Sequence, residues 1–285
     1  MGKYFRPMVL TMFYLFTIIV AGIFVVLILS VFRKDEIFSA ESGTFNDDIV
    51  GKLLESFYPF LLVISGILSL GLARVMKMTD FKGAYSCHNI NWKTAWIPII
   101  GTILLILIFG YSIEHIFVIP DGTPFTDKQS GYSMMDIVSM MLFILVSPVI
   151  EELLFFEANL RCMLTAGCTK TQAVIASAIF FAVLRVHPTS ILTDFVVGII
   201  FAMLFIKTGN IVLSTIMHIL NNTSCVILMN FYHLGGDSQR FPIAIDIVVI
   251  LLCLYPAYRI LCYYLYGQQQ PATADMESGS SKRTK

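Results

Sequence analysis

The chain of 285 residues is 57% hydrophobic and only 13% charged, and its formal net charge is +0. A soluble globular domain carries about 25% charged residues, so this chain lacks the polar side chains that would cover a water-soluble core of its size. The balanced charge gives no support for a nucleic-acid partner. We therefore expect an integral membrane protein whose first partner is the lipid bilayer.

Apolar segments in the sequence predict membrane-spanning helices, each of which needs roughly 20 mostly apolar residues. We predict eight spans, at residues 8–32, 57–72, 96–113, 135–160, 172–186, 190–206, 211–231 and 243–266. Only three residues separate the fifth and sixth segments, and one of them is Pro188, which favours a helix break and a tight antiparallel hairpin. The expected fold is an all-α polytopic bundle.

The distribution of Lys and Arg predicts the orientation of the bundle. A cytoplasmic N-terminus places 13 of these residues inside and 6 outside, which agrees with the positive-inside rule. We expect both termini in the cytoplasm and the plasma membrane as the location. We divide the chain into N-terminal helices and loops (1–130), a core that holds nearly all the polar residues within spans (131–266), and a disordered tail (267–285).

Two adjacent acidic residues, Glu151 and Glu152, lie within the fourth predicted span. Ionisable groups inside a bilayer are costly and usually mark function. Neighbouring residues on a helix point about 100° apart, so we expect one carboxylate to line a cavity and a neighbouring group to hold the other. The alternative is a pair at the inner water interface that contributes only charge.

Two further pairs occur at the four-residue spacing that puts side chains on one helix face. His218 and Asn222 lie on the seventh predicted span, where the amide can orient an imidazole or donate to an oxyanion. The alternative for His218 is a packing role. Phe181 and Arg185 lie on the fifth predicted span, and the alternative for Arg185 is an interfacial arginine that reaches water.

These sets of residues, in this order, resemble the motifs of the CPBP family of intramembrane proteases (CAAX proteases and bacteriocin-processing enzymes, also called the Abi family). The family carries E-E-x-x-x-R, F-x-x-x-H and H-x-x-x-N/D on separate helices. Residues 151–156, 181–185 and 218–222 align with these motifs, and the resemblance covers residues 140–231. It implies the fold of an intramembrane endopeptidase.

The resemblance also implies roles for single residues. A glutamate of the first motif, here Glu151, activates the attacking water, and His218 with Asn222 stabilises the oxyanion. The predicted catalytic residues are Glu151, Glu152, His218 and Asn222, and the predicted cavity-lining residues are Phe156, Phe181 and Arg185.

Two positions depart from the family pattern. Phe156 replaces the arginine of the first motif, and Arg185 replaces the histidine of the second. Arginine is effectively always protonated and cannot act as a base, although Arg185 can form an ion pair with a buried carboxylate of the first motif. A zinc site normally needs three protein ligands and a water, a requirement that Glu151, His218 and Asn222 meet poorly. We therefore predict no metal site, and the sequence identifies no cofactor.

Three hypotheses about function remain open. The first is a family member with impaired or lost catalysis that acts as a membrane regulator or scaffold. The second is an active intramembrane endopeptidase that uses Glu151 and His218 on a membrane-associated protein or peptide substrate. The third is a transporter or channel whose polar residues line a path. The two departures from the motifs favour the first hypothesis over the second.

Overall fold

The structure is a computed structural model of the chain. It describes residues 2–32, 47–79, 81, 84–85, 90–106, 134–183 and 188–235, and also residues 247–248, 250–252, 254–255, 258–259 and 262. Every element within these ranges is a helix, which confirms the predicted all-α fold. The predicted tail at 267–285 lies outside the described residues.

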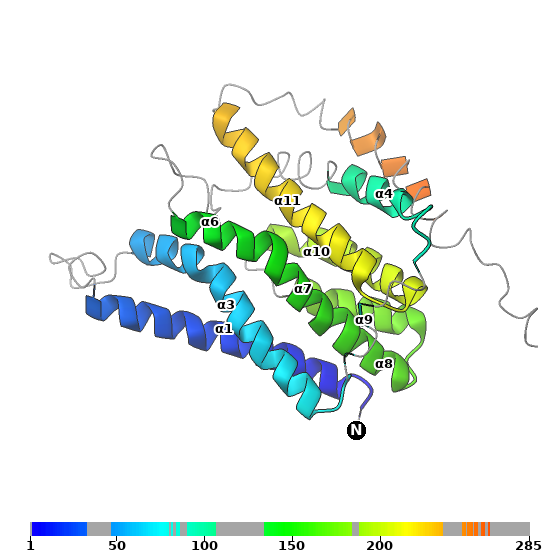
Figure 1. Cartoon of the computed structure of the whole chain (residues 1–285), viewed down its shortest axis with the longest axis horizontal. Helices are drawn as coiled ribbons and strands as arrows, with labels where there is room; N and C mark the ends of the chain where they lie inside the picture. The colour runs from blue at the N-terminus through cyan, green and yellow to red at the C-terminus, as the bar shows by residue number, and fades with distance from the viewer. Residues whose placement is uncertain are drawn as a thin grey trace, which may run out of the picture.

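Two long helices form one side of the bundle. Helix α1 (Phe5–Phe32) and helix α3 (Asp47–Val75) lie side by side (Figure 1). Helix α4 (Trp96–Ile106) packs against the last long helix, α11 (Val212–Gly235). The N-terminal helices also contact the core, because α3 packs against the helix that carries the two adjacent glutamates.

The central element is one continuous helical stretch from Met134 to Thr165, and it changes its hydrogen-bond register along its length. Its parts are α6 (Met134–Met141), η2 (Leu142–Val146), α7 (Ser147–Glu152), η3 (Leu153–Leu160) and α8 (Arg161–Thr165). The two η segments are π-helical, so their turns are wider than those of an α-helix.

Helices α9 (Lys170–Ala182) and α10 (Pro188–Thr208) pack closely along each other. A Cβ atom at Gly198 on α10 would lie 3.1 Å from a ring carbon of Phe181 and 3.2 Å from the Cα of Ala178. The absence of a side chain at Gly198 therefore permits the close approach, as small residues do at helix interfaces in membranes. The predicted pairing of the fifth and sixth segments agrees with this arrangement.

Several helices extend beyond the predicted spans. The second helix begins at Asp47, before the predicted span, because its first turns are polar and an apolar pattern cannot detect them, while the apolar part of the helix begins at Ser56, next to the predicted start at residue 57. The sixth begins at Pro188 rather than residue 190, since proline suits the first position of a helix, where its missing N–H would have no partner. Of the eighth predicted span, the structure describes only helical residues between 247 and 262.

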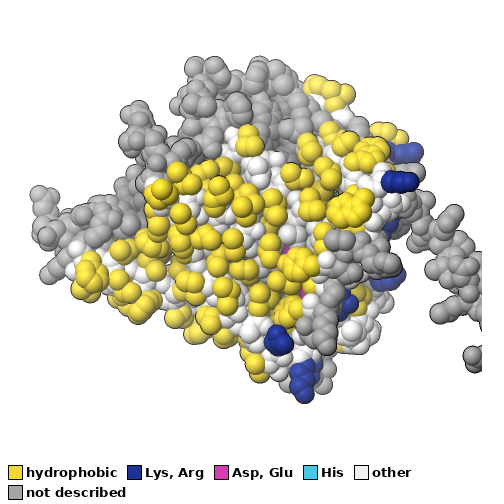
Figure 2. All heavy atoms as spheres, viewed as in Figure 1, with side chains coloured by type: hydrophobic (Ala, Val, Ile, Leu, Met, Phe, Trp, Pro, Cys, Tyr) yellow, Lys and Arg dark blue, Asp and Glu magenta, His cyan; other side chains and the backbone are white. Residues whose placement is uncertain are grey.

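The described helices suit a membrane. Those long and apolar enough to cross a bilayer are Phe5–Phe32, Ser56–Val75 and Met134–Thr165, and shorter apolar helices cover Trp96–Leu105, Lys170–Ala182 and Val212–Ile227. Figure 2 shows hydrophobic side chains over most of the visible described surface. On α1, exposed residues such as Phe16, Ile19 and Phe24 would face lipid. The chain is an integral membrane protein, and the total of eight spans and the boundary at residue 130 stay predictions.

Candidate active site

A proline disturbs the helix just before the two glutamates. Pro148 has no N–H, so it cannot donate to a carbonyl in the preceding turn. The N–H of Ser147 donates to the carbonyl of Leu142, five residues back, which is the π register. Glu151 and Glu152 therefore lie on a short α-helical segment between two π-helical ones. Such distortions occur frequently at functional sites.

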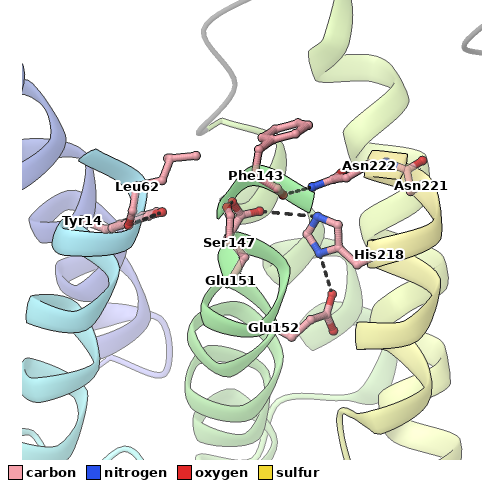
Figure 3. Close-up of polar contacts among 9 residues, drawn as sticks. All are labelled: Tyr14, Leu62, Phe143, Ser147, Glu151, Glu152, His218, Asn221 and Asn222. Atoms are coloured by element: carbon pink, nitrogen blue, oxygen red, sulfur yellow. Dashed lines mark hydrogen bonds and ion pairs between the residues drawn. The ribbon is translucent and has the colours of Figure 1, made fainter. Parts of the chain in front are cut away.

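Both glutamates contact one imidazole. The Nδ1 of His218 lies 3.1 Å from Oε1 of Glu152, and its Nε2 lies 3.6 Å from Oε2 of Glu151 (Figure 3). The hydroxyl of Ser147 donates to Oε1 of Glu151 at 2.6 Å. The side chains of His218 and Glu152 are 0% exposed and that of Glu151 is 4% exposed. Three groups that can carry charge are thus held together in the interior.

The geometry explains how two diverging side chains reach the same partner. We expected only one of the adjacent carboxylates to enter the site directly, because they point about 100° apart. The two ring nitrogens of an imidazole lie on different edges of the ring, so one carboxylate contacts each edge. A neutral imidazole has one N–H donor and one acceptor, and only the imidazolium donates from both nitrogens. The group can therefore bind a proton on either ring nitrogen of His218.

Asn222 follows His218 by one turn of α11 and contacts the central helix. Its Nδ2 donates to the carbonyl of Phe143 at 3.0 Å, and Nδ2 of Asn221 lies 3.4 Å from its Oδ1 (Figure 3). Asn222 is buried. At least one of its two amide hydrogens is therefore engaged with the backbone of π-helical segment η2 rather than directed to a ligand.

Aromatic rings surround the imidazole. The ring centroids of Phe181 and Phe201 lie 5.4 and 5.2 Å from that of His218. Phe156, which stands where the first motif has arginine, is fully buried, with its ring 6.0 Å from Phe181 and 6.3 Å from Phe201. An aromatic cluster thus occupies the space beside the Glu–His–Glu group.

Ser147 and Phe201 are contacts of the site that were not predicted from the sequence. Ser147 precedes Glu151 by four residues, and that spacing could have identified it. Phe201 lies in the apolar run of residues 195–206 on α10 and gave no signal. Arg185 falls in the segment 184–187, outside the described residues, so its predicted pairing with a carboxylate of the first motif stays a prediction.

A second polar cluster lies further along the central helix. Nε of Arg161 is 2.8 Å from Oε1 of Glu157, and its terminal nitrogen Nη2 donates to Oε2 of the same residue at 3.0 Å and to the carbonyl of Gly209 at 3.1 Å. Thr79 donates to Oε1 of Glu157 at 3.0 Å, and the guanidinium lies 5.1 Å from the ring of Phe205. The cluster joins α8 to the residues after α3 and to the turn before α11.

The segment between α3 and α4 contacts the start of α11. The carbonyl of Ala84 accepts from the N–H of Ile211 at 2.9 Å, at the start of α11. Burial, and to a smaller extent the negative charge of Glu152, together raise the pKa of Tyr85 to about 12. Tyr85 itself is 49% exposed.

The described residues contain no group of three or more His, Cys, Asp or Glu side chains arranged to hold a metal ion. Glu151, Glu152 and His218 contact one another instead, and the ring nitrogens of His218 face the carboxylates.

The residues of this site lie within one recognisable domain. Residues 133–224 match the family model described as type II CAAX prenyl endopeptidase Rce1-like. This part of the chain is a CAAX-protease-like domain within an integral membrane protein. The match confirms the resemblance to the CPBP family that the motifs predicted for residues 140–231. It covers the segments that carry Glu151, Glu152, His218 and Asn222, whose roles stay predictions. No curated protein matches the chain.

Proposed function

We propose that this Rce1-like domain has impaired or lost peptidase activity and acts as a membrane regulator or scaffold. One observation carries the proposal: both oxygens of Glu151 already face protein groups. Oε1 accepts from Ser147 at 2.6 Å, and Oε2 lies 3.6 Å from Nε2 of His218. A water that Glu151 is to activate would have to displace one of these contacts inside a buried cluster.

The two departures from the motifs support the same conclusion. Arg185 stands where the second motif has histidine, and a guanidinium cannot accept a proton from water near neutral pH. General base catalysis is worth roughly 10²–10⁴ in rate, so its loss leaves little hydrolysis. Phe156 contributes a buried ring where the first motif has a cation. The role that we propose for the domain is binding of a membrane-associated protein or peptide without cleavage.

The test is a cleavage assay on the full-length protein in lipid vesicles. The substrate is a farnesylated peptide that ends in a C-a-a-X sequence, since the matching family is described as a CAAX prenyl endopeptidase. We expect the natural chain to release no more of the three terminal residues than a Glu151→Ala variant does. Robust cleavage by the natural chain that Glu151→Ala abolishes would overturn the proposal.

Variants that restore the family motifs are expected to gain cleavage activity in the same assay. An imidazole at position 185 can exchange a proton near neutral pH, so Arg185→His is expected to raise cleavage above that of the natural chain. The double variant Arg185→His/Phe156→Arg also supplies the cation of the first motif. If neither variant gains activity, positions other than these two account for the missing hydrolysis.

An active endopeptidase is the second candidate, and the row Glu152–His218–Glu151 favours it. In this arrangement Glu152 holds the Nδ1–H of His218, while Nε2 accepts a proton from a water. The water oxygen bonds to the peptide carbonyl carbon, the carbon–nitrogen bond breaks, and the proton passes to the departing amine. This candidate requires cleavage by the natural chain that both Glu151→Ala and His218→Ala abolish.

We also propose that both termini face the cytoplasm at the plasma membrane. The support for this orientation is that the Lys and Arg side chains visible in Figure 2 lie on the side of the molecule where Figure 1 marks the N-terminus. Tags at each terminus that react with an impermeant reagent only after cells are permeabilised would agree with this orientation. Labelling of intact cells would contradict it.

A further inference from the structure

The π-helical turn before the glutamates leaves one backbone carbonyl without its expected donor. The N–H of Ser147 donates to Leu142, five residues back. In that register the carbonyl of Phe143 would accept from residue 148, which is a proline and has no N–H. A backbone carbonyl in a membrane interior needs a hydrogen-bond partner, because no water is there to supply one.

Asn222 supplies that partner from another helix. Its Nδ2 lies 3.0 Å from the carbonyl of Phe143, and the side chain is buried (Figure 3). Asn222 lies on α11 four residues after His218, so both side chains face the central helix. The contact therefore joins the distorted turn directly to the helix that carries the imidazole.

We propose that Asn222 is a positioning residue: its amide caps the carbonyl that Pro148 leaves without a donor and fixes the register between the helix of Glu151 and the helix of His218. The turn that it caps is followed at once by Ser147, whose hydroxyl holds Oε1 of Glu151. A fixed turn therefore holds the carboxylate of Glu151 in the orientation in which its Oε2 faces Nε2 of His218. The proposal concerns the geometry of the site and holds whether or not the chain hydrolyses a peptide.

A double-mutant cycle between the two helices tests this inference. Asn222→Leu keeps a side chain of similar shape but removes the donor, and Pro148→Ala returns an N–H to the central helix. The full-length protein is purified in detergent, and its thermal midpoint is measured. We expect Asn222→Leu to lower the midpoint by about 2–6 °C in the natural background. In the Pro148→Ala background we expect a change of less than about 1 °C, because the restored N–H makes the amide dispensable.

The adjacent residue provides a matched control. Asn221 is also a buried amide on α11, but its contact is with Asn222 at 3.4 Å rather than with the central helix. The effect of Asn221→Leu should therefore be the same with and without Pro148→Ala. The ring ¹⁵N signals of His218, identified with a His218→Gln variant, should shift in Asn222→Leu, since Glu151 moves relative to Nε2, and should stay in place in Asn221→Leu.

The results of these experiments test the capping role and the positioning role of Asn222 separately. Equal losses from Asn222→Leu in the two backgrounds would overturn the capping role, as would no loss in the natural background. An unchanged His218 spectrum in Asn222→Leu would overturn the positioning role. If Asn222→Leu gives no folded protein, recovery of folded protein in Asn222→Leu/Pro148→Ala supports the proposal, and failure of both contradicts it.

Discussion

A single methyl group at Gly66 should disturb the site through helix packing. Gly66 lies on α3, and a Cβ atom there would overlap Cγ2 of Ile150, the residue immediately before Glu151. Gly66→Ala must therefore push α3 and α7 apart or rotate one of them. Either movement displaces Glu151 from Nε2 of His218, which now lies 3.6 Å away.

The size of the effect follows from the overlap and its surroundings. Carbon atoms in contact lie about 3.5–4.0 Å apart, and Ile150 is buried, with a β-branched side chain that is stiff at χ1. Overpacking of this kind costs about 1–3 kcal/mol, while replacing a helical glycine recovers about 0.5–1 kcal/mol. The net loss is therefore about 0–2.5 kcal/mol, which lowers the thermal midpoint by up to roughly 10 °C.

Gly71 on the same helix provides the control. A Cβ atom at Gly71 would meet nothing within 4 Å, so Gly71→Ala should raise the midpoint by about 1–4 °C. Thermal unfolding of both variants in the same detergent gives the comparison. In an Ile150→Ala background the loss from Gly66→Ala should disappear. Equal thermal midpoints for Gly66→Ala and Gly71→Ala in the natural background would contradict this prediction.

Three further predictions concern the surroundings of the site. Phe156→Ala should cost about 3–5 kcal/mol by leaving a cavity in the aromatic cluster, seen as a large fall in thermal midpoint, whereas Phe156→Leu should cost much less. Glu152→Gln should lower the pKa of Tyr85 from about 12 toward its ordinary value, measured by tyrosinate absorbance against Tyr85→Phe. Because the folded pKa of Tyr85 is raised, its contribution to stability is present below about pH 10 and is lost as the pH rises toward 12. Arg161→Ala should lower stability by about 1–3 kcal/mol, since it leaves a buried carboxylate without its bidentate partner, and Lys170→Ala on the exposed start of α9 should change it by less than about 0.5 kcal/mol.

The fold was predictable where apolar length alone determines a helix. The first span was predicted to end at Phe32, where α1 ends, because its apolar run is continuous. The start of α3 at Asp47 was not predictable in this way, since the membrane requires apolar side chains only inside the bilayer and a helix can continue beyond it. Hydropathy therefore located the spans better than the helix ends.

The chemistry of the site was predictable only in part. Four-residue spacing placed His218 and Asn222 on one face, and both contact the central helix as that spacing suggests. The π register around Pro148 could not be read from spacing, because it depends on which distant group replaces the missing N–H donor. That group is the amide of Asn222, 79 residues away along the chain and 3.0 Å away from the carbonyl it caps.

The two contacts of His218 differ in length, and the difference bears on both candidate functions. The Nδ1–Glu152 distance of 3.1 Å is within hydrogen-bonding range, while the Nε2–Glu151 distance of 3.6 Å is beyond it. A neutral imidazole in this geometry carries its hydrogen on Nδ1, which leaves the lone pair of Nε2 facing Glu151. That is the tautomer a general base needs. Whether the chain hydrolyses peptides then depends on whether a water enters between Nε2 and Glu151, and the nearly complete burial of both side chains favours the form without hydrolysis.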